Sequence, residues 1–195
     1  MNLSDTNDSE PSRDHLPDKI RGVALDMDGL LFDTEQLYWQ VGDTVLQRRG
    51  HRFSAELQQR MMGRVALSAI QQMIDFHQLD DSPEELLDES DQLYGDLLVD
   101  GPQPMRGLGQ WIELLQQIGV PFGLATSSRR KFVDVIFSAI PWHGDLAFVL
   151  SGDDVSHGKP HPEMYLRAAE QFGISTCEML VLEDSGNGCA AGVAA

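Results

Sequence analysis

Hydrophobic positions along this chain follow two different periods, and the periods predict two kinds of element. Short uninterrupted apolar runs, of the kind that forms strands buried in parallel sheets, lie at residues 20–26, 120–125, 146–150 and 179–182. Apolar positions spaced by three or four residues predict helices over residues 108–118, 129–137 and 162–172, followed by an Ala-rich helix that begins near Gly186. Strands that alternate with helices are typical of an α/β fold with a parallel sheet.

The segment between residues 35 and 100 has helical spacing alone. It predicts helices over residues 37–46, 55–62, 67–76 and 82–98, the last with Ser82 as N-cap and Pro83 at its first position. No strand-like alternation occurs there, so we predict a small all-α insert of residues 36–100 in an α/β core of residues 19–35 and 101–195. Residues 1–18 are polar and aperiodic, which predicts a disordered leader.

Two carboxylates, Asp26 and Asp28, follow the first predicted strand, and Gly29 then allows a sharp turn. Open α/β sheets bind their ligands at the carboxyl ends of their strands. Two carboxylates that close repel each other unless a cation neutralises them or one of them stays protonated, and Mg²⁺ suits such oxygen ligands. A carboxylate can also attack phosphorus while a neighbouring acid serves the leaving oxygen. Taken alone, the pair is equally compatible with a solvated acidic loop.

Three further polar strings stand at the ends of predicted strands or before helices. Thr126, Ser127 and Ser128 precede a helix, where hydroxyls and free amides can bind phosphate, although a plain helix cap has the same composition. Lys159 lies between Gly158 and Pro160 and would ordinarily be a solvated charge. Glu183 and Asp184 end the last predicted strand, which indicates either a metal site or an acidic helix N-terminus.

In this order, the four strings resemble the four motifs of the haloacid dehalogenase-like (HAD) superfamily of phosphohydrolases, and the helical insert resembles the cap of one of its subclasses. The resemblance covers residue 20 to the last residue and implies a Rossmann-like parallel sheet with helices on both faces. It also implies the roles of site residues. Asp26 would be the nucleophile and Asp28 the acid and base, while Thr126, Ser127 and Lys159 would bind phosphate. Mg²⁺ would be bound by Asp26, the backbone carbonyl of Asp28, Asp184 and, more weakly, Glu183.

The string Met62-Gly63-Arg64 resembles the cap loop of the β-phosphoglucomutase-like branch, and Arg64 is a candidate phosphate ligand. The mutases of that branch carry an Arg where this chain has Ala66 and a His where it has Tyr38, and both differences favour hydrolysis. Dehalogenases of the superfamily lack the second aspartate, so Asp28 argues against them. Phosphonate hydrolysis calls for a cap lysine, and residues 35–100 contain none.

The resemblance therefore implies a Mg²⁺-dependent phosphatase that hydrolyses a small phosphorylated metabolite, such as a sugar phosphate, through an aspartyl-phosphate. A sugar-phosphate mutase and an inactive truncated metal-binding domain stay open as alternatives. Family members normally continue with another strand and helix beyond the point where this chain ends, at residues 192–195. We therefore expect either a fragment, truncated at its C-terminus, or a sheet with an unprotected edge.

The net charge of the chain limits the kinds of molecule that it can bind. With 31 acidic and 14 basic residues, the chain has a formal net charge of −17, which disfavours nucleic acids and anionic membranes as partners. Two cysteines, Cys177 and Cys189, do not make a disulfide framework. No apolar run approaches a membrane span and no signal-peptide pattern precedes the core, so we expect a cytoplasmic protein. We also expect a monomer.

Overall fold

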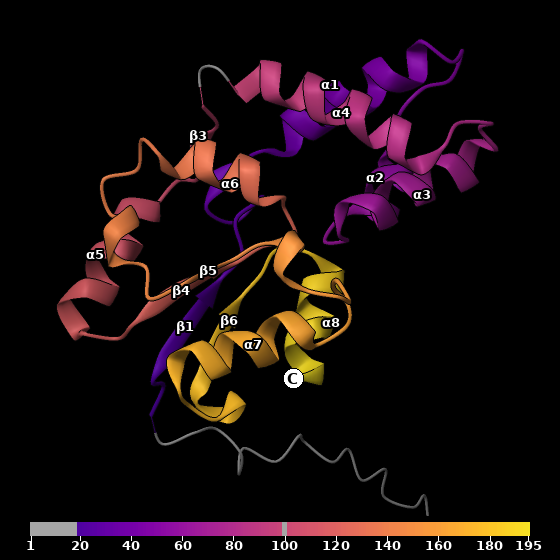
Figure 1. Cartoon of the computed structure of the whole chain (residues 1–195). Helices are drawn as coiled ribbons and strands as arrows, with labels where there is room; N and C mark the ends of the chain where they lie inside the picture. Colours follow the sequence, from indigo (N-terminus) through magenta and orange to yellow (C-terminus); the bar gives the residue numbers. More distant parts are fainter. Residues whose placement is uncertain (1–18, 99–100) are drawn as a thin grey trace, which may run out of the picture.

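Residues 19–98 and 101–195 are described by a computed structural model of the chain, and they form an α/β body with a group of helices at one end (Figure 1). The predicted disordered leader, residues 1–18, lies outside the described residues. The body contains a parallel sheet in the order β5-β4-β1-β6. Its strands are β1 (Gly22–Leu25), β4 (Phe122–Ala125), β5 (Val149–Leu150) and β6 (Met179–Leu182). The predicted parallel sheet is confirmed.

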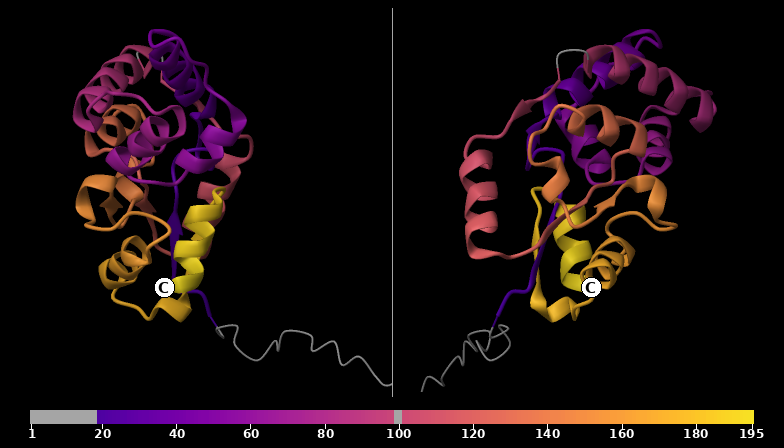
Figure 2. Two further views of the ribbon diagram at one scale, coloured as in Figure 1. Left: turned by 90° about the vertical axis from the view of Figure 1, so that its right-hand side faces the viewer. Right: turned by 60° about the vertical axis from the view of Figure 1, so that its left-hand side comes forward.

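Helices cover both faces of this sheet because the side chains of its strands alternate. On one face, Val23 and Leu25 of β1 pack with side chains of α5 (Leu108–Ile118) and α6 (Arg130–Phe137). On the other, Ala24 packs with side chains of α7 (Glu163–Phe172) and α8 (Gly186–Ala194). The right-hand view of Figure 2 shows α5 on one side of the sheet and α7 and α8 on the other. The predicted helices on both faces are confirmed.

Four helices form a separate group, which we call the helical cap, beyond the carboxyl ends of the strands (Figure 1). They are α1 (Glu35–Gln47), α2 (Ala55–Met61), α3 (Ala66–His77) and α4 (Pro83–Leu97). Ser82 caps α4 as the sequence predicts, because its side chain accepts a hydrogen bond from the amide of Glu85. Within the described ranges, the structure has no helix that is both long and apolar enough to cross a membrane.

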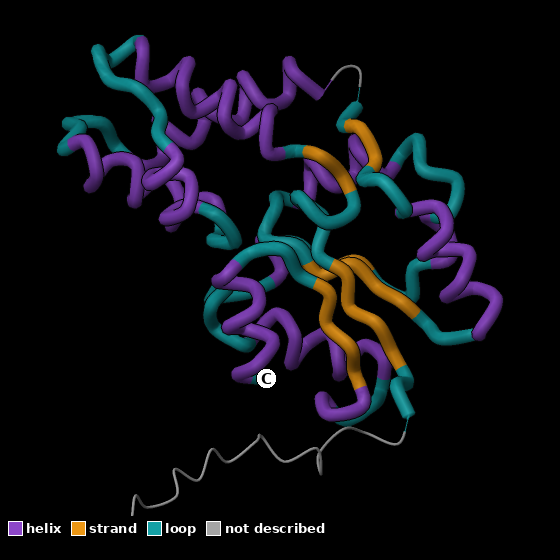
Figure 3. The backbone as a smooth tube through the Cα atoms, turned by 180° about the vertical axis from the view of Figure 1, so that it is seen from behind, coloured by secondary structure: helices purple, strands orange, loops and turns teal. Residues whose placement is uncertain are grey.

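A short antiparallel pair, β2 (Phe32–Asp33) with β3 (Gln103–Pro104), joins the segments that lead into and out of the cap. Figure 3 shows this pair apart from the main sheet and beside the helices. The sequence did not predict it, because two residues are too few to show a period and Pro104 is unusual in a strand. Three short 3₁₀ helices, His143–Asp145, Gly152–Asp154 and Thr176–Glu178, were likewise not predicted.

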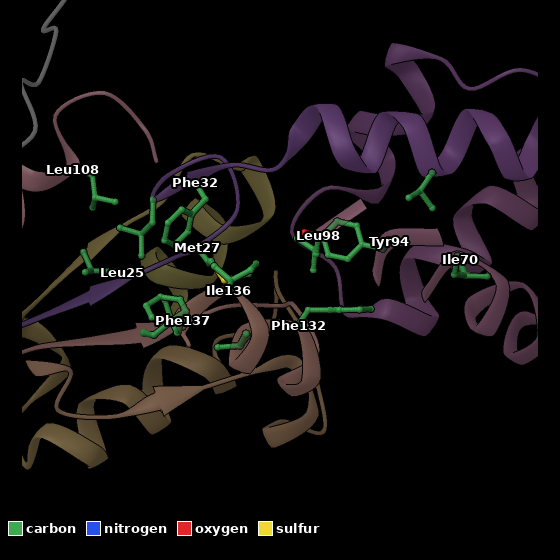
Figure 4. Packing of buried hydrophobic residues seen from close by; sticks show 14 of the residues in the cluster. Leu25, Met27, Phe32, Ile70, Tyr94, Leu98, Leu108, Phe132, Ile136 and Phe137 are labelled. Atoms are coloured by element: carbon green, nitrogen blue, oxygen red, sulfur yellow. The ribbon is translucent and has the colours of Figure 1, made fainter. Parts of the chain in front are cut away.

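Aromatic packing joins the cap to the core. Tyr94 of α4 and Phe132 of α6 lie edge to face with ring centroids 4.8 Å apart, and both belong to the buried cluster that extends from the sheet into the cap (Figure 4). The buried carboxylate of Asp91 on α4 accepts a hydrogen bond from Arg129 and lies 2.8 Å from the ammonium of Lys131. The cap therefore contacts the core through apolar packing and through a charge cluster centred on the buried Asp91.

We expect Gly123→Ala to lower stability, because a Cβ there would lie 2.5 Å from the ring of the buried Phe148. The cost of such overpacking is about 1–3 kcal/mol. Gly109→Ala in α5 is the matched control, since its Cβ would meet no described atom within 4 Å and alanine favours helix by up to about 1 kcal/mol. Urea unfolding of the two variants measures both effects, and equal stabilities would contradict this account of the sheet packing.

Candidate active site

The parallel strands bring the predicted site residues to one edge of the sheet. Asp26 follows β1, Thr126 follows β4, and Glu183 follows β6. These positions are far apart in sequence, but the carboxyl ends of neighbouring parallel strands lie side by side. The loop before α7 adds Lys159 to the same place. The structure therefore groups residues that the sequence could place only one at a time.

Lys159 connects three of the strand ends. Its buried Nζ donates to Asp26 Oδ1 at 2.7 Å, to the carbonyl oxygen of Ala125 at 3.0 Å and to the carboxylate of Glu183. These three contacts use all three donors of the ammonium group. Burial alone would lower the pKa of Lys159, but the two carboxylates raise it, so the side chain stays charged.

Glu183 is held tightly beside this lysine. Its carboxylate accepts hydrogen bonds from the hydroxyl of Tyr165 and from Ser185 Oγ, the latter at 3.1 Å. Gly188 is necessary here, because a Cβ at that position would lie 1.9 Å from the Glu183 carboxyl carbon. These contacts indicate that Glu183 positions Lys159, while its weaker assignment as a metal ligand stays a prediction. Sequence reasoning did not single out Tyr165, because a buried tyrosine within helix α7 gives no local signal of a contact with Glu183.

Asp184 lies against the turn at Gly29, which follows Asp26 and Asp28. Gly29 has a φ of +74°, and a Cβ there would lie 2.0 Å from Asp184 Oδ2, so glycine allows both the turn and the approach of the carboxylate. Carboxylate oxygens of Asp26, Glu183 and Asp184 lie within 4.8 Å of one another. Burial, together with the charge of Glu183, raises the pKa of Asp184 to about 6. Burial also raises the pKa of Asp26 well above its ordinary value, even though Lys159 opposes this.

Asp28 is oriented by hydroxyl groups. Its Oδ2 accepts hydrogen bonds from Ser128 Oγ at 2.6 Å and from Thr126 Oγ1 at 3.3 Å, and Ser128 Oγ lies 2.9 Å from the hydroxyl of Tyr38 on α1. Its Oδ1 is buried and has no hydrogen-bond partner among the described residues. Burial raises the pKa of Asp28, while the hydrogen bonds lower it in part. Ser128 belongs to the predicted hydroxyl string, but its contact with Asp28 was not predicted.

The cap loop at Gly63 rests directly on the core. Ser127 Oγ donates to the carbonyl of Gly63 at 2.9 Å, and Asn187 Nδ2 donates to the carbonyl of Met62 at 2.7 Å. A Cβ at Gly63 would lie 2.7 Å from Ser185 Oγ, which explains the glycine at this approach. Arg64 follows, with its Nε bonded to the carbonyl of Arg60 at 2.8 Å.

A cavity of about 190 Å³ lies between cap and core. Of the residues predicted from the sequence, five line it, namely Asp26, Asp28, Asp184, Ser127 and Arg64. The other three, Thr126, Lys159 and Glu183, are absent from the lining and have side chains bonded to lining residues or to each other. The structure thus brings the predicted residues together in two layers, one facing the cavity and one supporting it.

A second group with possible metal ligands lies outside this cavity. His157, His161 and Glu163 place one ligand atom each within 4.8 Å of the others. The Glu163 carboxylate, however, already accepts the backbone amides of Ser156 and His157, both at 2.9 Å. These hydrogen bonds hold the loop before α7 in place, and they explain why the three side chains lie close together.

Comparison with known proteins agrees with this geometry. The family model described as a haloacid dehalogenase-like hydrolase matches residues 20–195. The chain is 32% identical to (DL)-glycerol-3-phosphatase 2 of Arabidopsis thaliana over 87% of this chain and 73% of that protein. It is 28% identical to phosphoglycolate phosphatase of Escherichia coli over 90% of this chain and 78% of that protein.

A solved structure, that of β-phosphoglucomutase from Clostridium difficile, has the same fold, with a TM-score of 0.80 at 15% identity over 89% of this chain and 80% of that one. At this identity the likeness concerns the fold alone. The family match, which covers most of the chain, and the similarity to proteins named as phosphatases together identify it. The chain belongs to the haloacid dehalogenase-like hydrolase family and is a phosphoric monoester hydrolase.

Proposed function

We propose that this enzyme is a Mg²⁺-dependent phosphatase that releases phosphate from a small phosphorylated metabolite through an aspartyl-phosphate. The observation that supports this best is the pair Asp26 and Asp28 on the cavity wall, one bonded to a buried lysine and the other to hydroxyl groups. Two carboxylates in different surroundings suit two roles, a nucleophile and an acid–base group. The relatives are named for different small phosphate esters, which supports the substrate class.

In the first step Asp26 attacks phosphorus. Lys159 holds Oδ1, so Oδ2 is the oxygen left to form the new bond to phosphorus. As that bond forms, the bond from phosphorus to the leaving oxygen breaks, and Asp28 gives its proton to that oxygen. Ser128 and Thr126 hold Asp28 Oδ2, so the unpartnered Oδ1 is the oxygen suited to carry the proton.

In the second step water attacks the phosphorus of the aspartyl-phosphate. Asp28, now a carboxylate, takes a proton from this water, and the bond between phosphorus and Asp26 breaks to release phosphate. Lys159 again neutralises the returning carboxylate of Asp26, so the enzyme recovers its starting state. The cap loop at Gly63 covers the site and limits the entry of other water.

Magnesium fits the donors at the mouth of this site. Asp26, Asp184 and, as the family resemblance implies, the backbone carbonyl of Asp28 would hold it, with Glu183 the weaker candidate. These are hard oxygen donors, and burial, together with the charges of the neighbouring carboxylates, raises the pKa values of Asp26 and Asp184. When bound, the ion supplies positive charge that neutralises the phosphoryl oxygens. The monomeric state and the cytoplasmic location stay predictions.

A sugar-phosphate mutase is the alternative, and it differs in its product, an isomer in place of free phosphate. The residues at issue are Tyr38, which bonds to Ser128, and Ala66, which lines the cavity with no charge to offer. Neither provides the His or Arg that the mutase branch carries. Measurement of phosphate release from hexose phosphates, beside isomer formation, separates the two functions.

We expect Asp26→Asn to lower the turnover of p-nitrophenyl phosphate with Mg²⁺ by roughly 10³-fold or more, because the nucleophile is lost. The matched control is Asp80→Asn, since Asp80 is exposed between α3 and α4 and lies outside the cavity lining. The rate of phosphate release is measured for both variants and for the unaltered enzyme. Equal rates in Asp26→Asn and the unaltered enzyme would refute the nucleophile assignment.

Asp28→Asn should behave differently with the same ester, because p-nitrophenolate leaves without a proton while the aspartyl-phosphate still needs a base. We expect a rapid burst of one p-nitrophenolate per enzyme, followed by a steady rate lower by about 10²–10⁴-fold. Rapid-mixing absorbance measures the burst. A steady rate like that of the unaltered enzyme would show that Asp28 is not the base.

Magnesium should stabilise the fold, and more strongly at higher pH. Because the pKa of Asp184 is raised to about 6, this carboxyl is protonated below that pH and must lose its proton to bind the ion. At one fixed concentration, set to 100 times the dissociation constant measured at high pH, the ion should add about 2.7 kcal/mol to the free energy of unfolding at that pH, and progressively less as the pH falls through the raised pKa values of Asp26 and Asp184. Thermal unfolding with and without Mg²⁺ measures this.

In Asp184→Asn the Mg²⁺-induced rise in unfolding temperature should be much smaller, whereas Asp80→Asn should keep it. An equal rise in all three proteins, or one that does not depend on pH, would contradict the assignment of Asp184 as a ligand.

A further inference from the structure

The cavity above Asp26 continues into the helical cap, where its lining changes character. Val41 of α1, Met61 of α2 and Ile70 and Met73 of α3 line this part, together with Phe53 from the loop between α1 and α2. Val41, Phe53, Ile70 and Met73 are buried. We call the part lined by these five side chains the apolar chamber. It adjoins the carboxylates on which the proposed reaction takes place, so it lies where the leaving group of an ester would lie.

Positive charge is scarce in the cavity lining, which also contains the carboxylates of Glu35 and Asp91 beside those of the proposed reaction. The two cations in the described lining are Arg64 and Arg129, and Arg129 is paired with the buried carboxylate of Asp91. Arg64 is partly exposed, and its Nε is bonded to a backbone carbonyl. An anionic group that lay among the five side chains of the apolar chamber, away from Arg64, would enter apolar surroundings without a partner, which is unfavourable.

The uncharged hydrogen-bonding side chains that the cap helices contribute to the lining are those of Tyr38, Gln58, Ser90 and Tyr94. Ser90 Oγ donates to the carbonyl of Leu86 at 2.8 Å, and the hydroxyl of Tyr38 is bonded to Ser128, so both are already engaged. The hydroxyl of Tyr94 is buried and has no partner among the described residues, and it could serve one polar atom. A polyol would lose more hydrogen bonds to water than this lining could replace.

The size of the cavity sets the size of the ligand. Its volume of about 190 Å³ includes the space beside the carboxylates. An apolar cavity of about 150 Å³ is large enough to bind benzene. A body of this size would take up most of the cavity, so the chamber accommodates no more than one aromatic ring or a short alkyl chain.

We propose that the substrate is a phosphate monoester of an uncharged alcohol with an apolar body, an aromatic ring or a short alkyl chain, which lies in the apolar chamber. This inference rests on the proposed phosphatase function. It separates this enzyme from one that prefers bisphosphates, phosphorylated carboxylates or sugar phosphates. Each methylene group buried in the chamber should favour binding by about fourfold.

The test compares esters of primary alcohols, so that the reacting bond is similar and the body differs. We expect kcat/KM with Mg²⁺ to be about 10²-fold higher for benzyl phosphate and n-hexyl phosphate than for glycerol 3-phosphate and glucose 6-phosphate. Methyl phosphate, which has no body to bury, is the reference. A preference for glycerol 3-phosphate or glucose 6-phosphate would overturn the inference and leave the phosphatase function standing.

A variant that fills the chamber tests its location. Ala69 of α3 lines the cavity, and Ala69→Leu should lower kcat/KM for benzyl phosphate by about tenfold or more, mainly through KM, while methyl phosphate changes less than about twofold. Ala55→Leu is the matched control, because Ala55 is exposed at the start of α2 and is not in the lining. Equal losses for both esters in Ala69→Leu would contradict the assignment.

Binding provides a readout that does not need turnover. Benzylphosphonate, whose bond between carbon and phosphorus does not hydrolyse, should bind at least about tenfold more tightly than 2-hydroxyethylphosphonate in the presence of Mg²⁺. Calorimetry measures both. If no ester is hydrolysed, the phosphatase function fails, and this comparison still decides the chamber. Equal affinities would overturn the inference.

Discussion

The buried ammonium of Lys159 is the constraint on which the rest of the site depends. A charge removed from water is tolerated only when it is paired and hydrogen-bonded, and Lys159 meets this condition through Asp26, Glu183 and the carbonyl of Ala125. Its partners follow three neighbouring strands, so the charge can be satisfied only when β4, β1 and β6 lie side by side in register. The same lysine bonds to Asp26, the residue that we propose as the nucleophile, and so links the fold to the proposed chemistry.

Around this centre, small residues set the distances. Gly29 lets Asp184 approach the turn after Asp26, Gly188 makes room for Glu183, and Gly63 lets the cap loop rest on Ser185. At each of these positions, the Cβ of any other residue would collide with a site residue. The acidic cluster that results is electrostatically unfavourable without a cation, because its carboxylates lie close together and that of Asp26 is buried. This crowding is consistent with the proposed Mg²⁺ site.

The helical cap contributes a different kind of surface. The core contributes charged and hydroxyl groups to the cavity lining, whereas the cap contributes apolar side chains such as Ile70 and Met73, which we propose contact the leaving group. The cap contacts the core where Tyr94 packs on Phe132 and where Asp91 pairs with Arg129 and Lys131. These contacts lie beside the cavity. Such a division allows one catalytic edge to serve different substrates, because the cap can change while the strand ends stay the same.

The sequence by itself determined the order of strands and helices, the parallel sheet and the positions of Asp26, Asp28, Lys159 and Asp184, because apolar period and short motifs are local properties of the chain. It could not predict the pair β2–β3, which is too short to show a period.

Only the tertiary structure decided which side chains meet. Lys159 and Asp26 are 133 residues apart, and Ser128 and Asp28 are 100 apart, so no local pattern records their contacts. The roles of Glu183 and Tyr165 beside the lysine, and the apolar chamber in the cap, depend in the same way on distances across the fold. Periodicity describes how each segment folds, whereas a site is made of atoms that packing brings within a few ångströms of one another.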